Sequence, residues 1–184
     1  GADFDADNER GYNVFSFGRA LGDSPPHSYQ VWRQDFDQML CEHARECGSD
    51  VREGQQVVAV EQRDPRQTRI EGHADDGAEH AIQARYVVDA SGRDAFLSTK
   101  HKLKRRNRQH QSAALFAHYS GVDYNTGDPD GNIISVYRFA HGWAWFIPLP
   151  SGDTSIGCVC KPEYLKQRRG ASNADFMART LDLV

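Results

Sequence analysis

No stretch of this sequence approaches the roughly 18 consecutive apolar residues that a membrane-spanning helix needs. The opening residues, GADFDADNER, contain neither a positively charged segment nor an apolar one, so they do not predict a secretory signal. We therefore expect a cytoplasmic protein that makes no contact with a membrane.

An excess of positive charge is missing as well. The chain carries 22 lysines and arginines against 26 aspartates and glutamates, and its net charge of −4 does not favour a general affinity for nucleic acid. The basic run at residues 100–110 contains no aromatic side chain that could stack on bases. We expect this run to be an exposed connection without a specific ligand.

Cysteine is scarce, and its pattern does not match a zinc motif. Neither Cys41 and Cys47 nor Cys158 and Cys160 have the CxxC spacing of such a site. We expect free, buried thiols in a reducing compartment and no bound metal. No histidine is paired with a serine or cysteine in a recognisable nucleophile arrangement, so the sequence predicts no catalytic residue.

The chain has 184 residues, of which 39% are hydrophobic and 26% charged, and this composition is typical of a globular protein with a core. The clearest element is a helix at 33–48, where Phe36, Met39 and Leu40 form an apolar stripe and Gly48 provides a stop. Both ends read as cut, because the first ten residues show no start signal and the last helix stops in mid-pattern. We therefore expect a piece of a longer polypeptide.

Strands dominate the rest of the sequence. We expect one strand at 28–32, a strand pair around Gly54, and a hairpin whose long second strand ends in Tyr86-Val87-Val88, an apolar run typical of a strand covered on both faces. Further strands are predicted in GYNVFSFGRAL, SAALFAHYSGV, IISVYRFAHG, WAWFIPL and SIGCVC, with helices after Gly92 and near the end of the chain. The fold class is therefore mixed, α/β or α+β.

The run HGWAWFIPLPSGDTSIG is unusual because two of the three tryptophans lie in it. On a strand, Trp143, Trp145 and Ile147 share one face, and the residues between them share the other. Such a strand is expected to be buried on both sides and to end at Pro148. The composition favours packing in a core, and the alternative is that the tryptophans form the wall of a pocket.

A second unusual segment, DASG at 89–92, follows an apolar strand and precedes a helix. Gly92 would permit close approach of a phosphate or ribose, and the helix start would supply N–H groups. The alternative is a structural turn in which Ser91 and Asp94 are ordinary helix caps. Arg33, at the start of the long helix, could reach a phosphate or could be a surface arginine.

The order of these pieces resembles the middle of an FAD-dependent oxidoreductase of the para-hydroxybenzoate hydroxylase-like superfamily. The resemblance covers residues 28–160 and is strongest to flavin-dependent halogenases, whose W-x-W-x-I-P signature is matched by Trp143, Trp145, Ile147 and Pro148. It implies a single partial domain at 1–184, the central portion of a flavoprotein. Within it, a cofactor-side segment at about 28–98 is joined to a mostly antiparallel, substrate-side sheet at about 111–161.

The resemblance also implies roles for particular residues. The tryptophan strand would be a bulky wall between flavin and substrate, formed by Trp143, Trp145, Ile147 and Pro148. The residues implied to contact FAD, at its diphosphate and adenine region or in the segment that closes over it, are Arg33, Val57, Val58, Ala90, Ser91 and Gly92. The GxGxxG fingerprint, the catalytic lysine and the downstream Gly-Asp segment of the family are not found, and TGDPDG at 126–131 is predicted to be a turn.

The activity implied for the parent enzyme is halogenation of an electron-rich aromatic, phenolic or pyrrolic and often carrier-tethered. It would use reduced FAD, oxygen and halide, with a separate flavin reductase as partner. Two alternatives remain: an FAD-dependent monooxygenase or reductase of the same fold, or a non-catalytic binding remnant without cofactor. We expect this chain alone to be inactive and to bind FAD weakly or not at all.

Overall fold

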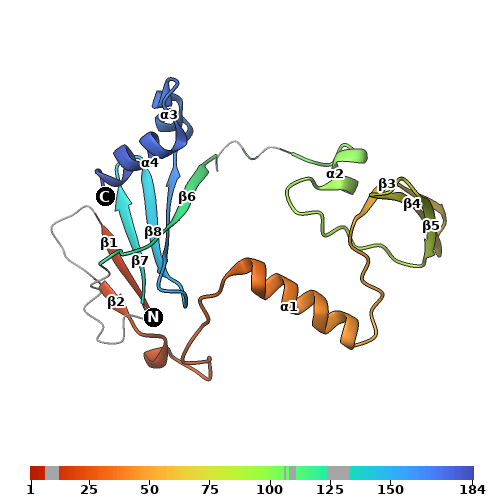
Figure 1. Cartoon of the computed structure of the whole chain (residues 1–184), viewed down its shortest axis with the longest axis horizontal. Helices are drawn as coiled ribbons and strands as arrows, with labels where there is room; N and C mark the ends of the chain where they lie inside the picture. Colours follow the sequence, from red (N-terminus) through yellow and green to blue (C-terminus); the bar gives the residue numbers. More distant parts are fainter. Residues whose placement is uncertain (7–12, 106, 108–110, 124–132) are drawn as a thin grey trace. The chain divides into compact units, whose positions relative to one another are not determined.

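The structure, a computed structural model, describes residues 1–6, 13–105, 107, 111–123 and 133–184 (Figure 1). They form two compact units: unit 1 combines Gly1–Gln38 with Arg108–Val184, and unit 2 is Met39–Asn107. The expected mixed fold class is confirmed, because unit 1 holds a mixed sheet and unit 2 an antiparallel one. The turn predicted at 126–131 and part of the basic run lie outside the described residues.

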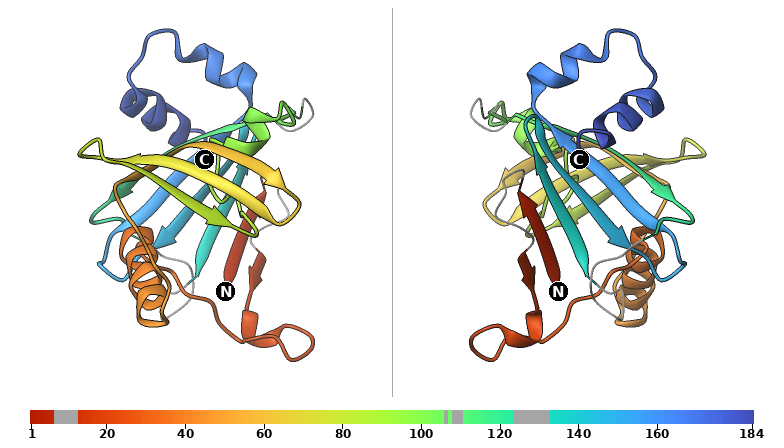
Figure 2. Two further views of the ribbon diagram at one scale, coloured as in Figure 1. Left: turned by 90° about the vertical axis from the view of Figure 1, so that its right-hand side faces the viewer. Right: turned by 90° about the vertical axis from the view of Figure 1, so that its left-hand side faces the viewer.

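Six strands form the sheet of unit 1, in the order β2-β1-β7-β8-β9-β6 (Figure 2). They are β1 (Ala2–Ala6), β2 (Asn13–Phe15), β6 (Ala113–Tyr119), β7 (Ile134–Phe139), β8 (Gly142–Pro148) and β9 (Thr154–Cys160). Every neighbouring pair is antiparallel except β1 and β7, which run parallel. The predicted mostly antiparallel sheet is therefore confirmed.

Strand β1 was not expected from the sequence. Its residues ADFDA include two aspartates, a residue type that is depleted in strands. Pairing with β7 overrides this preference, with Ala2 opposite Ile134 and Phe4 opposite Val136. Asp3 is only 1% exposed, and neither carboxylate oxygen has a hydrogen-bond partner among the described residues.

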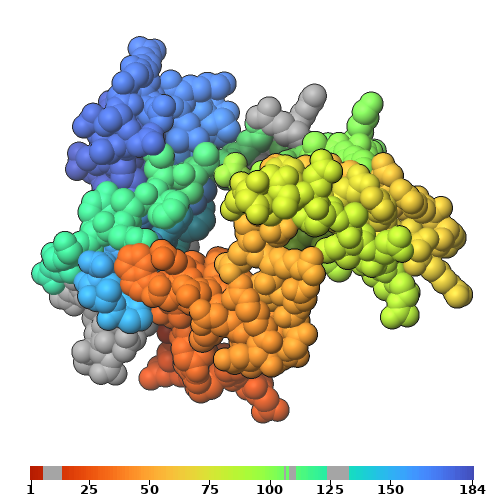
Figure 3. Space-filling model, turned by 45° about the vertical axis from the view of Figure 1, so that its right-hand side comes forward, coloured from red at the N-terminus to blue at the C-terminus, as the bar shows by residue number. Residues whose placement is uncertain are grey.

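The core of unit 1 lies on one face of this sheet. Alternate residues of β9, with Ala144 from β8 and Phe139 from β7, contact the C-terminal helices α3 (Pro162–Leu165) and α4 (Asn173–Leu181). A short 3-10 helix at Lys166–Arg168 joins the two helices, which are blue in Figure 3. Ser172 caps α4, because its Oγ accepts a hydrogen bond from Asp175 N at 3.0 Å. The predicted strands and helices from β7 onward are therefore confirmed.

The segment before the long helix differs from the prediction. Among the described residues of GYNVFSFGRAL, β2 is the only strand and is followed by a 3-10 helix at Phe17–Arg19, and residues 28–32 form no strand. Helix α1 (Arg33–Glu46) is confirmed, and Gly48 ends it with φ +90°. In the described part of the chain, no helix has the length and apolarity needed to cross a membrane.

Unit 2 is built on a three-stranded meander of β3 (Gln55–Asp64), β4 (Gln67–Ala74) and β5 (Glu79–Ala84). The predicted turns on either side of β4 are confirmed. The pair of strands expected around Gly54 is wrong, because a single long strand begins after this glycine. Gly54 has φ +64°, a left-handed conformation that favours glycine and interrupts an extended strand.

The long second strand of the predicted hairpin is also wrong. Strand β5 ends at Ala84, and Tyr86 and Val88 are each 88% exposed. Their apolar character suggested burial on both faces, but among the described residues no strand pairs with this segment. The helix expected after Gly92 is present as α2 (Phe96–Lys100).

The cysteines are free, as predicted, but only two are buried. Cys158 and Cys160 point into the core from β9, whereas Cys41 and Cys47 are exposed. Burial, with a smaller contribution from neighbouring Cys160, raises the pKa of Cys158 to about 12. The expectation of burial is wrong for the first pair because the apolar stripe of α1 is itself exposed, at Phe36, Met39 and Leu40.

Candidate functional site

The two tryptophans of β8 lie on the sheet face opposite to the core. Trp143, Trp145 and Ile147 share this face, whereas Ala144 between them is fully buried in the core cluster. Trp143 is 42% exposed. The expectation that both faces of this strand are buried is wrong, because α3 and α4 pack on the face that holds Ala144. Core packing does not explain Trp143, and its role in a pocket wall stays a prediction.

Trp145 lies against the neighbouring strand β9. Its cross-strand partner is Gly157, and a Cβ atom built at this glycine would lie 2.2 Å from Cζ2 of the indole. The indole Nε1 donates a hydrogen bond to Ser155 Oγ at 3.3 Å. The ring of Trp143 lies alongside, with the two ring centroids 5.8 Å apart. The polar atom of Trp145 is thus satisfied within the sheet, and its ring offers an apolar surface.

Three more aromatic side chains extend this surface across unit 1. Ring centroids are 6.4 Å apart for Phe116 and Trp145, 6.3 Å for Phe116 and His118, and 4.4 Å for His118 and Trp32. We call Trp32, Phe116, His118, Trp143 and Trp145 the aromatic face. Alternation along AALFAHY places Phe116 and His118 on one side of their strand. Sequence reasoning still missed them, because nothing in the sequence indicates that β6 pairs with β9.

Ile147 and Pro148 complete the signature at the end of β8, and both are half-buried. Pro148 pairs with Thr154 in the last position of the ladder, as expected for a residue that has no N–H to donate. Pro148 also lines a cavity of about 460 Å³ together with His27 and Tyr29. The end of the signature strand therefore adjoins the segment that precedes α1.

Arg33 begins α1 directly after a tethered tryptophan. Trp32 Nε1 donates to Ser151 Oγ at 3.2 Å, which fixes this point of the chain at the β8–β9 turn. Arg33 Nε and Nη2 donate to the two carboxylate oxygens of Asp37 at 3.0 and 2.8 Å. The guanidinium holds the pKa of Asp37 below its ordinary value. Asp37 thus takes one bidentate edge of the guanidinium, where a phosphate would have to compete with it, so this contact stays a prediction.

The segment at 89–92 caps helix α2. Asp89 Oδ2 accepts a hydrogen bond from Leu97 N at 2.8 Å, and Ser91 Oγ accepts one from Phe96 N at 2.9 Å. The Ser91 hydroxyl and backbone N–H both donate to Asp89 Oδ1. These hydrogen bonds hold the pKa of Asp89 below its ordinary value. The bond from the Ser91 hydroxyl has the largest effect, followed by those from the backbone N–H groups of Leu97 and Ser91.

The capping alternative is therefore right for Ser91. Asp94 accepts a hydrogen bond from the Thr99 hydroxyl through its backbone carbonyl and not through its carboxylate. The carboxylate that caps the helix is that of Asp89. Gly92 has φ +62°, and a Cβ atom built there would meet no atom within 4 Å, so its backbone is open to a ligand. Contact of Ala90, Ser91 and Gly92 with a cofactor stays a prediction.

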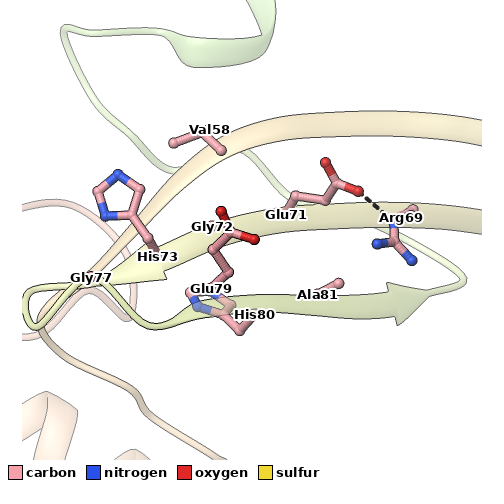
Figure 4. Close-up of a pocket in the computed structure, with 9 residues that line it drawn as sticks. All are labelled: Val58, Arg69, Glu71, Gly72, His73, Gly77, Glu79, His80 and Ala81. Carbon is pink, nitrogen blue, oxygen red and sulfur yellow. Dashed lines mark hydrogen bonds and ion pairs between the residues drawn. The ribbon is translucent and has the colours of Figure 1, made fainter.

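Val57 and Val58 lie at an irregularity in β3, where the pairing with β4 shifts register between Val57 and Ala59. Val58 lines a hollow of about 520 Å³ in unit 2 (Figure 4). The polar residues around this hollow are Arg69, Glu71, His73, Glu79 and His80. Arg69 Nε donates to Glu71 Oε1 at 2.5 Å and lowers the pKa of that carboxyl. These polar residues were not singled out from the sequence.

The residues of the tryptophan signature lie together, whereas the predicted cofactor residues are distributed over both units. Trp143, Trp145, Ile147 and Pro148 lie on one strand of unit 1, whereas the predicted cofactor residues belong to both units: Arg33 to unit 1, and Val57, Val58, Ala90, Ser91 and Gly92 to unit 2. Across the described ranges, no group of three or more His, Cys, Asp or Glu side chains is placed to hold a metal ion.

Comparison with known proteins gives consistent matches. The family described as tryptophan halogenase matches residues 12–180. The flavin-dependent halogenase armH3 of Armillaria mellea is 30% identical over 97% of this chain and 36% of its own length. A 1H-pyrrole-2-carbonyl-[peptidyl-carrier protein] brominase of Pseudoalteromonas luteoviolacea is 34% identical over 80% of this chain and 36% of its own length.

The structure of the myxobacterial chondrochloren halogenase CndH superposes with a TM-score of 0.78 and 27% identity, covering 99% of this chain and 41% of that one. The chain thus spans little more than a third of the length of the curated relatives named above. The resemblance drawn from the tryptophan signature is confirmed, and the chain belongs to the tryptophan halogenase family.

Proposed function

We propose that the whole protein is an FAD-dependent halogenase that acts on an electron-rich aromatic ring. The observation that carries this proposal is the aromatic face of unit 1, in a chain that belongs to a halogenase family. Trp143 and Trp145 offer ring surfaces on the side of the sheet that the core helices leave open. A planar aromatic substrate stacks favourably on such rings in offset or edge-on geometry.

We propose a separate contact with FAD for each of the residues expected to hold it. The hollow beside Val58 contains the carboxylates Glu71 and Glu79, and its Arg69 is already paired, so it suits the uncharged adenosine portion better than the diphosphate. Arg33, whose side chain is 79% exposed, is the group that would hold a phosphate, in competition with Asp37. Gly92 would allow the cofactor to approach the backbone closely.

The residues of this chain would bind and orient the substrate. FAD, once bound and reduced, would react with oxygen and so supply the oxidant for the halide. Trp143 and Trp145 would exclude water from the reacting ring and fix its plane, and Phe116 would extend the surface on which it rests. The indole N–H of Trp145 is already donated to Ser155 Oγ, so this ring would offer the substrate an apolar surface rather than a hydrogen bond.

For the substrate we propose a phenolic or pyrrolic ring attached to a carrier protein. The brominase relative supports this choice, because its name specifies a pyrrole-carbonyl group on a peptidyl carrier protein. A separate flavin reductase would supply reduced flavin. We place the protein in a reducing, cytoplasmic compartment, which is consistent with the four free cysteines.

The test is a turnover assay with the full-length protein. It would be given FAD, a flavin reductase, NADH, oxygen and either chloride or bromide, with free phenol, free pyrrole and pyrrole-carbonyl carrier protein as probes. Mass spectrometry of the products would reveal halogen incorporation, which supports the proposal. A hydroxylated product without halogen would favour the monooxygenase alternative. A purified protein that neither binds FAD nor turns over a probe would favour the binding remnant.

A further inference from the structure

Gly157 occupies a position in β9 where the sheet has no room for a side chain. It lies between Trp145 on β8 and Phe116 on β6, and it pairs with both. A Cβ atom built at Gly157 would lie 2.2, 2.4 and 2.5 Å from Cζ2, Cη2 and Cε2 of the Trp145 indole. These distances are far below van der Waals contact, so the indole rests directly on the backbone of Gly157.

This glycine is required by space rather than by backbone conformation. Its φ lies outside the left-handed region, and any L-residue could adopt its extended geometry. Glycine weakens a strand interior, and there it often marks the close approach of another group. All three of the nearest atoms belong to the Trp145 ring, so a larger residue at 157 would displace the ring and not the backbone.

A second contact fixes the orientation of the same ring. The indole Nε1 donates to Ser155 Oγ, two residues before Gly157 on the same face of β9. The benzo part of the ring is therefore held against Gly157, and the pyrrole part is held at Ser155. Trp143 faces Val159 instead of a glycine and is 42% exposed, so it does not share this arrangement.

We infer that Gly157 is a positioning residue that holds the Trp145 indole flat across β9 and thereby sets the depth of the aromatic face. This inference rests on the proposed function only in assigning the face to a substrate. A side chain at position 157 would lift the indole into the space above the sheet and reduce the room for a planar ring. Gly157 would then determine the size of aromatic substrate that the protein accepts.

The experiment uses this chain with Trp32→Phe and Trp143→Phe, so that Trp145 is the sole tryptophan. Gly157→Ala is compared with Gly18→Ala, because a Cβ atom at Gly18 would meet its neighbours at an ordinary 3.8 and 3.9 Å. We expect Gly157→Ala to shift the emission of Trp145 to the red and to raise its quenching by acrylamide, with no change for Gly18→Ala. Unchanged emission and quenching in a folded Gly157→Ala chain would overturn the inference.

A double-mutant cycle tests the same contact through stability, and it stays informative when Gly157→Ala alone does not fold. Urea unfolding is compared for the unaltered chain, Gly157→Ala, Trp145→Leu and the double variant; if Gly157→Ala alone shows no transition, the readout is whether the double variant folds as Trp145→Leu does. We expect the loss in unfolding midpoint caused by the alanine to be recovered when the indole is absent. A loss that persists without Trp145 would contradict the inference. Neither measurement involves FAD, halide or substrate, so failure here is distinct from failure of the proposed halogenation.

Discussion

The carboxylate of Asp89 and the backbone N–H of Leu97, eight residues apart, are joined by a hydrogen bond of 2.8 Å. This bond connects the segment after β5 to the first turn of α2, where helix N–H groups lack partners of their own. With the Ser91 hydroxyl as a second acceptor, it gives a helix of only five residues two side-chain caps. The stability of α2 therefore depends on groups that precede the helix in the sequence.

Replacing Asp89 by alanine is expected to lower the melting temperature of the chain at neutral pH. The folded-state pKa of Asp89 is depressed, so its contribution is complete above the unfolded pKa and is lost as the pH falls through the folded value. The difference in melting temperature between the two chains should therefore shrink in acid. Asp94→Ala is the matched control. An equal loss in both variants, or a difference that persists at low pH, would contradict the capping role.

The two faces of the unit 1 sheet should differ in their sensitivity to truncation. Phe176 is 2% exposed within the core cluster, so Phe176→Ala should lower the free energy of unfolding by about 3–5 kcal/mol. Trp143→Ala should cost clearly less, because this indole is 42% exposed. Urea unfolding monitored by circular dichroism measures both. If the two losses are equal, Trp143 is packed as a core residue, and the statement that it lies on an open face of the sheet is wrong.

The thiols should separate into two classes in their reaction with Ellman's reagent. Cys41 and Cys47 are exposed and should react in the native chain, whereas Cys158 and Cys160 should react only after denaturation. Raising the pH toward 9 should still leave Cys158 unreactive, because its pKa is about 12 and the thiolate is the reactive form. A chain with Cys41→Ser and Cys47→Ser should show no native-state reaction, and any that remained would place the buried pair within reach of solvent.

This chain by itself is expected to bind FAD weakly or not at all. Its sequence contains no GxGxxG segment, and Arg33, the predicted phosphate contact, is occupied by Asp37. Titration of FAD, followed by the flavin absorbance and by equilibrium dialysis, should show no stoichiometric complex. Asp37→Ala frees Arg33 and should strengthen any weak binding, while Arg33→Ala should abolish that gain. Tight binding by the unaltered chain would refute this expectation.

Elements that depend on local pattern could be predicted from the sequence. Helix α1 follows from its apolar spacing and from Gly48, and β7, β8 and β9 follow from alternation between turn residues. The reading of β8 placed Trp143 and Trp145 on one face correctly. The alternation could not show which face the helices cover, because that is decided by the tertiary packing of α3 and α4 and not by the pattern within the strand.

Features that depend on long-range pairing could not be predicted. Aspartates argued against β1, and only the ladder with β7 makes this strand. Phe116 and His118 join the aromatic face because β6 pairs with β9 across two intervening strands of sequence. Conversely, Tyr86 and Val88 are apolar residues that the sequence predicted to be buried, yet among the described residues no strand pairs with their segment and both are exposed.

The parallel ladder of β1 with β7 also has a consequence for the order in which the chain folds. It joins Ala2 to Ile134, so unit 2 lies entirely within the loop that this pairing closes. Closing so long a loop costs more chain entropy than forming the meander of β3, β4 and β5, where each strand pairs with the next. We expect pulsed hydrogen exchange during refolding to detect protection in β3–β5 before β1, since unit 1 is completed only when the two distant parts of the chain meet.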